Sequence, residues 1–218
     1  NLKVSCLLTY LDSVKIYEGD KIERDELVKV INWCRSLDCK YIRIFAGSSP
    51  SKTLNKNATF LLIDSIISLT NIVSEFEIVL LIETHHDSLT DNLESSIEFY
   101  NLLPLKKQCL LDLANLLELS ENWLKCYDKL IGFAPILHVK NAWYIPNKLN
   151  NPFRRVHNKD FDSNLPTLSE GIINYSRIIN SKVYSSLEWI TFEWFGSNVA
   201  AIAKNELIHL KRLLNDDF

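Results

Sequence analysis

Short apolar runs alternate along the chain with longer segments in which apolar residues recur at helical spacing. Six runs have the length and composition of β-strands: residues 3–8, 41–46, 77–83, 109–113, 134–140 and 189–194. Several of them, such as EIVLLIE and CLLDL, are apolar almost without a break. Continuous apolar strands are typical of parallel sheets that are covered on both faces.

The segments between these runs predict amphipathic helices. Residues 24–37 place an apolar stripe on one helical face, and residues 59–73 follow the same period. Residues 90–103 begin with Thr90, which we expect to be the N-cap of a helix with an acidic first turn. Residues 122–130 and 169–181 predict two further helices.

Strand–helix alternation predicts an α/β protein, either an open doubly wound sheet or a (β/α)8 barrel. A dinucleotide-binding doubly wound sheet has a glycine-rich turn, but this chain has five glycines and no GxGxxG motif. Polar residues fall at the carboxyl ends of successive strands, where barrel active sites are built. We therefore expect a TIM barrel, forming one domain over residues 1–218. The chain has only six expected strands and begins with Asn1 rather than Met. We therefore also expect that the first one or two βα units of the barrel are lacking from this chain.

The composition narrows the class of partner. The chain has 218 residues, 47% of them hydrophobic, and a net charge of −3, which gives no support to a nucleic-acid-binding surface. No apolar run approaches the roughly 18 residues that cross a membrane. Five cysteines without CxxC spacing, four of them in apolar segments, suit reduced thiols in a cytoplasmic protein.

Four ionisable residues lie within or at the end of otherwise apolar strands: Glu83, Asp112, His138 and Glu193. One such residue is commonly part of a salt bridge or marks a strand that reaches solvent. Four of them on strands of one barrel favour a shared explanation, because unpaired buried charge is costly. Carboxylates and an imidazole at a barrel mouth suit one divalent metal ion, and Mn, Mg, Co and Zn all remain open.

The order of the motifs resembles the sugar phosphate isomerase/epimerase family, a group of xylose-isomerase-like TIM barrels. The resemblance covers nearly the whole chain. It rests on VSCLLTY, YIRIFAGSSP, LLIETHHDSLTDN, CLLDLANLL, ILHVKNAW, LSEGIINYSRII and ITFEW. It implies that Glu83, Asp112, His138 and Glu193 are the metal ligands, which agrees with the strand-end pattern.

The resemblance also implies a reaction. A metal-bound sugar or sugar phosphate would lose a proton next to its carbonyl through a metal-stabilised enediolate, giving isomerisation or epimerisation. Glu83 and Glu193 would be the catalytic acid–base pair. A homodimer is the expected assembly.

Five more residues are candidate substrate contacts, each with a plainer alternative. His85 would point to the same side of an extended segment as Glu83, and Lys140 would stabilise a developing oxyanion. Arg43 would orient a hydroxyl or a ligand carboxylate, or form a structural salt bridge. Trp143 would stack on a sugar ring or pack in a loop, and Arg155 would bind phosphate or belong to a solvated basic loop.

Two departures from the family's pattern weaken any inference of a particular substrate from the resemblance. Asn115 stands where many epimerases have the His of D-x-x-H, and the common glycine-rich segment is reduced to LSEGII. A lyase of the inosose-dehydratase kind, with the same metal, is the main alternative. An endonuclease-IV-type phosphodiesterase would need more histidines and a basic face. A non-catalytic sugar-binding barrel would not need all four ligands.

Overall fold

The computed structural model of the chain describes residues 2–117, 122–142, 166–179, 186–194, 196 and 198–215. Contacts between residues divide the chain into two compact units, Asn1–Leu110 and Leu111–Phe218, here called unit 1 and unit 2. The prediction of a single domain over residues 1–218 stays a prediction.

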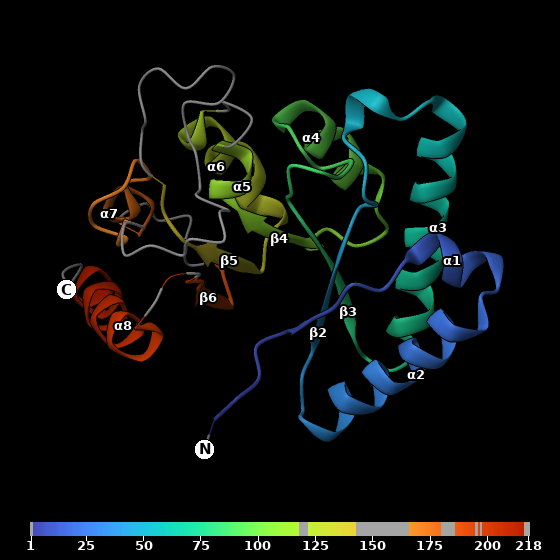
Figure 1. Ribbon diagram of the computed structural model, residues 1–218, viewed down its shortest axis with the longest axis horizontal. Helices are drawn as coiled ribbons and strands as arrows, with labels where there is room; N and C mark the ends of the chain where they lie inside the picture. The colour runs from blue at the N-terminus through green and yellow to red at the C-terminus, as the bar shows by residue number, and fades with distance from the viewer. Residues whose placement is uncertain are drawn as a thin grey trace. The chain divides into compact units, whose positions relative to one another are not determined.

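Unit 1 is built from short strands that each lead through a helix to the next strand (Figure 1). Arg43 and Leu81, for example, are register partners on adjacent parallel strands, as are Phe45 and Glu83. The strands are β1 (Leu7–Leu8), β2 (Tyr41–Phe45), β3 (Val79–Glu83) and β4 (Cys109–Asp112), whose last two residues belong to unit 2. The helices are α1 (Ser13–Glu18), α2 (Lys21–Ser36), α3 (Lys56–Ser74) and α4 (Leu93–Leu102), with the 3-10 turn η1 (Ser51–Thr53).

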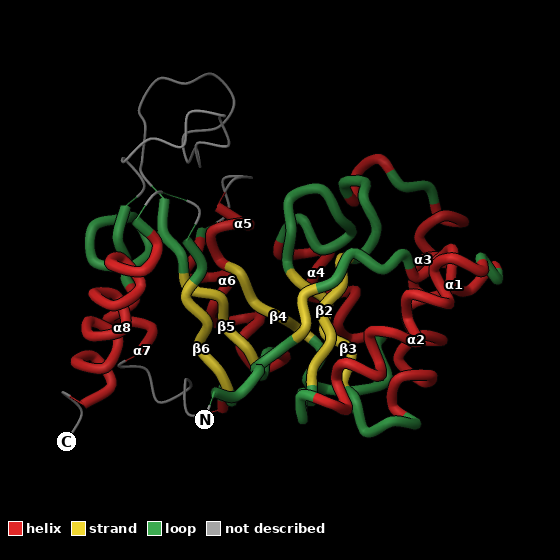
Figure 2. Tube along the Cα trace, turned by 60° about the horizontal axis from the view of Figure 1, so that its bottom comes forward, coloured by secondary structure: helices red, strands yellow, loops and turns green. Residues whose placement is uncertain are grey.

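Unit 2 continues the same alternation. Strands β5 (Ile136–Val139) and β6 (Trp189–Phe192) pair in parallel, with His138 opposite Thr191, and lie side by side in Figure 2. Helix α8 contacts both β6 and α7. The helices are α5 (Leu113–Leu117), α6 (Trp123–Leu130), α7 (Tyr175–Ile179) and α8 (Val199–Asn215), with the 3-10 turn η2 (Ile131–Phe133).

The strand order along the sheet is the order along the chain, β1-β2-β3-β4-β5-β6. A doubly wound sheet reverses its strand order at a switch point, whereas a (β/α)8 barrel adds each strand beside the preceding one. The observed order therefore confirms the barrel type of architecture. All six expected strands are present, each shorter than its apolar run; β1 has only two residues with register partners on β2.

The N-cap expected at Thr90 is wrong. Helix α4 begins after Asn92, whose side-chain oxygen accepts a hydrogen bond from Ser95 N at 3.0 Å. The Thr90 hydroxyl instead donates to the carbonyl oxygen of Glu83 at 2.8 Å. Threonine and asparagine both cap helices. The sequence could not show that the Thr90 hydroxyl would be bonded to the end of β3 instead.

Helix α3 is the one described helix that is long and apolar enough to cross a membrane: it has 19 residues, and its most apolar 18-residue stretch has a mean hydropathy of 1.3. Length and composition are weak evidence, because the core helix of a globular protein meets the same criterion. Seven residues of α3, including Ile66, Leu69 and Val73, are buried within the described structure. The helix also contacts α1 and β3, as expected of a core helix.

Buried cysteines give a first testable prediction. Burial raises the pKa of the Cys34 thiol and that of the Cys109 thiol to about 12. A thiol with this pKa is ionised to a fraction on the order of 10⁻⁴ at pH 8, and only the thiolate is alkylated rapidly. We expect iodoacetamide to leave both residues unmodified in the native protein and to modify both in urea. Peptide mass spectrometry after a short exposure measures this, and fast native labelling would contradict the burial.

Candidate functional site

Glu83 is the last residue of β3 and is buried, with 3% of its surface exposed. Its carboxylate pairs with the equally buried Arg43 of β2, whose Nε lies 2.9 Å from Oε2. Arg43 Nη1 also donates to the carbonyl oxygen of Thr9 at 2.8 Å. A carboxylate buried without a counter-charge is strongly destabilising, so the Arg43 guanidinium is what offsets the charge of Glu83. This ion pair fits both roles expected for Arg43, orientation of a ligand carboxylate and a structural salt bridge, so the choice between them stays a prediction.

Aromatic rings cover the guanidinium of Arg43. The centroid of Phe45 lies 4.3 Å from its central carbon, and that of Tyr10 lies 5.4 Å away. Cation–π attraction of this kind holds the plane of an arginine in a fixed orientation. The pattern of apolar residues did not distinguish these rings from core aromatics, although Phe45 stands two residues after Arg43 on the same strand.

His85 lies in unit 1, two residues beyond the end of β3, and its expected orientation stays a prediction. Strand β3 ends at Glu83, and the chain turns from His86 onward. The imidazole of His85 packs on the ring of Phe45 at 4.4 Å and stacks on His86 at 4.2 Å. Because Phe45 is the register partner of Glu83, His85 still belongs to the surroundings of that carboxylate.

In unit 2, Asp112 ends β4 with its side chain fully buried. Its Oδ1 accepts hydrogen bonds from Ala114 N at 3.0 Å and Asn115 N at 3.2 Å. Both amides belong to the first turn of α5, so one carboxylate oxygen is committed to the start of a helix. Asn115, which stands where many epimerases have the histidine of D-x-x-H, contributes its backbone amide to one of these bonds.

Four predicted residues meet in unit 2. The Lys140 ammonium forms ion pairs with Asp112 Oδ2 and with Glu193 Oε2, the latter at 2.5 Å. His138, with 1% of its surface exposed, turns Nδ1 toward both acids, 4.0 Å from Asp112 Oδ2 and 3.9 Å from Glu193 Oε1. Glu193 follows β6 directly, and its side chain is 23% exposed, so it is the accessible member of a buried cluster.

Tyr175 fixes the backbone of Lys140. Its hydroxyl donates to the Lys140 carbonyl at 2.6 Å and accepts from the Lys140 amide at 3.1 Å. Burial raises the pKa of Tyr175 well above its ordinary value, and the charge of Asp112 adds to the shift, so the phenol stays protonated. A tyrosine within the apolar run IINYSRII was the only sequence signal for this role.

Asn141, next in the H-x-K-N motif, has a structural role. Its amide nitrogen donates to the carbonyl oxygens of Leu168 and Ile173, both at 3.0 Å, and its Oδ1 accepts from Ile173 N at 2.9 Å. A Cβ on Gly171 would lie only 2.1 Å from the Asn141 side chain. The retained glycine of LSEGII is thus required by close packing against this asparagine.

The cluster in unit 2 fits a divalent metal by the chemistry of its donors. Carboxylate oxygens and one imidazole nitrogen are ligands shared by Mn, Mg, Co and Zn. The cluster also already binds a cation, because the Lys140 ammonium lies between Asp112 and Glu193. Trp143 and Arg155, the remaining predicted contacts, lie outside the described residues.

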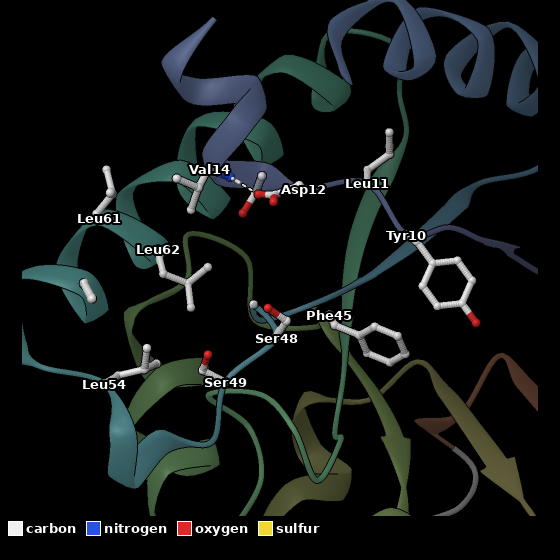
Figure 3. A pocket seen from close by; sticks show the side chains of 13 residues that line it. Tyr10, Leu11, Asp12, Val14, Phe45, Ser48, Ser49, Leu54, Leu61 and Leu62 are labelled. Carbon is white, nitrogen blue, oxygen red and sulfur yellow. Dashed lines mark hydrogen bonds between the residues drawn. The ribbon is translucent and has the colours of Figure 1, made fainter. Parts of the chain in front are cut away.

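Unit 1 contains a cavity of about 400 Å³ at the carboxyl ends of β1 and β2. Figure 3 shows Leu54, Leu61 and Leu62 around one part of it, with Phe45 and Ser48 on another side. This volume and mainly apolar lining are typical of a site for a small ring or an apolar group. Phe45 lines the cavity and also covers Arg43, so the cavity borders the Arg43–Glu83 pair.

Comparison with solved structures defines the class of fold. The chain superposes on a xylose-isomerase-like TIM barrel protein from Mycobacterium smegmatis in complex with magnesium, with a TM-score of 0.73 and 16% identity over 99% of this chain and 74% of that one. An L-ribulose 3-epimerase and an AP endonuclease family 2 protein from Brucella melitensis match with TM-scores of 0.64 and 0.59, at 11% and 14% identity. The chain therefore has the xylose-isomerase-like TIM-barrel fold, and the resemblance seen in the sequence is confirmed.

Two comparisons point to more particular relatives. A 3-dehydroshikimate dehydratase from Bacillus anthracis is 26% identical over 213 residues, which are 94% of this chain and 74% of the relative. The crystal structure of the probable 3-DHS dehydratase of petrobactin synthesis from the same organism gives a TM-score of 0.78 at 21% identity, over 96% of this chain and 77% of that one. No protein-family model matches the chain.

The Arg43–Glu83 pair gives a second prediction. Replacing Arg43 by Met leaves the Glu83 carboxylate buried without this counter-charge, and we expect the free energy of unfolding to fall by about 3–5 kcal/mol. Urea denaturation measures the loss. The matched control is Lys21→Met, which breaks the exposed Lys21–Asp25 pair of α2 and should leave stability unchanged. An equal loss of unfolding free energy in the two variants would show that burial does not determine the contribution of the Arg43–Glu83 pair.

Proposed function

We propose that this chain is a metal-dependent enzyme that removes a proton from the carbon next to a carbonyl in a polyhydroxylated ketone. The observation that carries the proposal is the unit 2 cluster, in which an accessible glutamate, a buried aspartate and a histidine surround one cationic centre. Neighbours with this fold include proteins whose structures contain magnesium or zinc.

We propose that Asp112, His138, Glu193 and Glu83 hold one divalent ion, with Mn, Mg, Co and Zn as candidates. Glu83, Asp112 and His138 are buried residues with ligating atoms. Support for including Glu83 comes from strand register: its partner on β4 is Leu110, and Asp112 follows two residues later on the same strand. Alternate residues of a strand share a face, so the two acids project from the same side. A bound divalent ion would polarise the carbonyl and stabilise negative charge on its oxygen.

Glu193 is the residue we assign as general base. The side chain of Asp112 is fully buried, and one of its oxygens accepts hydrogen bonds from helix amides. The side chain of Glu193 is 23% exposed and can approach a substrate. Lys140 donates to Glu193 and, close to the reacting atoms, supplies a positive charge for a developing oxyanion. His85, Arg43, Trp143 and Arg155 remain proposed substrate contacts.

The same proton abstraction has two outcomes. Loss of a hydroxyl, as water, from the carbon next to the deprotonated one gives dehydration. Return of the proton to the opposite face of the same carbon gives epimerisation, and its delivery to the former carbonyl carbon gives isomerisation. We put dehydration first, because the 26% identical relative is a dehydratase and Asn115 departs from the D-x-x-H of many epimerases. Isomerisation or epimerisation of a sugar or sugar phosphate is the second candidate, supported by the fold neighbours that are sugar epimerases.

Substitution of the base gives a third prediction. Glu193→Gln keeps the shape of the side chain but removes the proton acceptor, so we expect turnover to fall by about 10²–10⁴-fold. Metal content measured by mass spectrometry on the same samples separates loss of the base from loss of the metal. Activity at the wild-type level with metal still bound would remove Glu193 from the mechanism.

Reaction in D₂O gives a fourth prediction, which separates the two outcomes. A screen should contain dehydroshikimate-like cyclic ketones, inososes, ketohexoses, pentuloses and their phosphates. Dehydration yields a product 18 mass units lighter than the substrate by the loss of one water, and epimerisation with solvent exchange yields a product of unchanged formula carrying deuterium. A protein that binds no divalent metal and converts none of these compounds would contradict the proposed function.

A further inference from the structure

The side chain of Lys140 belongs to the metal-type cluster without being able to ligate a metal. Its ammonium has three N–H donors and no lone pair while it is protonated. It donates to Asp112 Oδ2 and to Glu193 Oε2 from a position that is only 5% exposed. The backbone of Lys140 is held on both sides by the Tyr175 hydroxyl. The backbone of Lys140, directly after β5, is therefore fixed by these two contacts, and a rearrangement at the cluster would involve its side chain.

Asp112 has one oxygen to offer to a cation. Its Oδ1 already accepts from two amides at the start of α5, at 3.0 and 3.2 Å. A cation that binds Asp112 without disrupting that helix start must use Oδ2, which is the oxygen that Lys140 contacts. The second contact of Lys140 is to Glu193 Oε2, an oxygen of the other proposed ligand in the cluster.

His138 faces the same place. Its Nδ1 lies 4.0 Å from Asp112 Oδ2 and 3.9 Å from Glu193 Oε1, distances longer than hydrogen bonds. An ion ligated by these three side chains would lie beside the oxygens that bind the ammonium. Two cations at one pair of oxygens repel each other strongly in a buried site.

We infer that Lys140 and the divalent metal compete for Asp112 Oδ2 and Glu193 Oε2, so that metal loading releases the Lys140 ammonium from both. The inference rests on the proposed function, because it takes these acids to be metal ligands. Lys140 then has two successive roles. Its ammonium neutralises the two acids when no metal is bound, and after release it is available to bind a negatively charged group of the substrate. Metal binding and anion binding would thereby be coupled through one side chain.

The test is Mn²⁺ binding by isothermal titration calorimetry to the full chain. Lys140→Met keeps the length of the side chain and removes its charge, so we expect the Kd for Mn²⁺ to fall by about tenfold or more. Lys140→Arg keeps a competing cation and should not show this gain. Lys129→Met, at an exposed position on α6, makes the same change of net charge away from the cluster and should leave the Kd unchanged.

The outcomes separate this inference from the proposed function. Mn²⁺ binding by the wild type with no gain in Lys140→Met overturns the competition alone. Absence of Mn²⁺ binding by both proteins overturns the competition together with the proposed metal centre. Equal gains in Mn²⁺ affinity for Lys140→Met and Lys129→Met would show that the effect comes from net charge alone. That outcome would also overturn the competition.

A measurement on the wild-type protein covers the case in which Lys140→Met does not fold. Acetylation of lysines by a brief pulse of reagent, mapped by peptide mass spectrometry, reports how accessible and reactive each amine is. Because the ammonium loses its ion pairs, we expect Mn²⁺ to increase the modification of Lys140 several-fold. The modification of Lys129 should stay unchanged. Equal protection of Lys140 with and without Mn²⁺ would overturn the inference.

Discussion

Burial of carboxylates at the ends of parallel strands is the constraint on which the chemistry of this protein depends. Each buried acid needs a cation or several donors, because an uncompensated buried charge costs several kcal/mol. Unit 1 meets this need with Arg43 beside Glu83, under the rings of Phe45 and Tyr10. Unit 2 meets it with Lys140 between Asp112 and Glu193. The two counter-ions differ, because the Arg43 guanidinium is held in a fixed plane whereas the Lys140 ammonium stands at the end of a flexible side chain.

This difference has consequences for function. Arg43 is tied to Glu83, to a backbone carbonyl and to aromatic faces, so its place in the structure is set by several contacts. Lys140 is anchored through its backbone by Tyr175, and its ammonium contacts two acids that are also proposed metal ligands. Arg43 is thus a fixed counter-ion of its acid, whereas Lys140 is the counter-ion that we propose to be exchangeable.

The fold explains why one set of acids suits more than one reaction. In a barrel of parallel strands, residues at the carboxyl ends supply the chemistry, and the loops beyond them supply the substrate contacts. A carbonyl next to an exchangeable proton is common to dehydration and epimerisation, so the acids can be the same in both. Loop residues such as Ser48 and Leu54 line the unit 1 cavity.

The sequence by itself determined the elements and the acids. All six strands, the helices over residues 24–37 and 59–73, and the strand-end positions of Glu83, Asp112, His138 and Glu193 were predicted from apolar period and from charge in apolar runs. Such signals are local, so they are visible without a structure. Only the tertiary structure decided the partners. Arg43 pairs with Glu83 across 40 residues, Lys140 with Glu193 across 53, and Tyr175 fixes Lys140 across 35. Strand register and side-chain reach set these contacts, and neither is encoded in the spacing of one residue type along the chain.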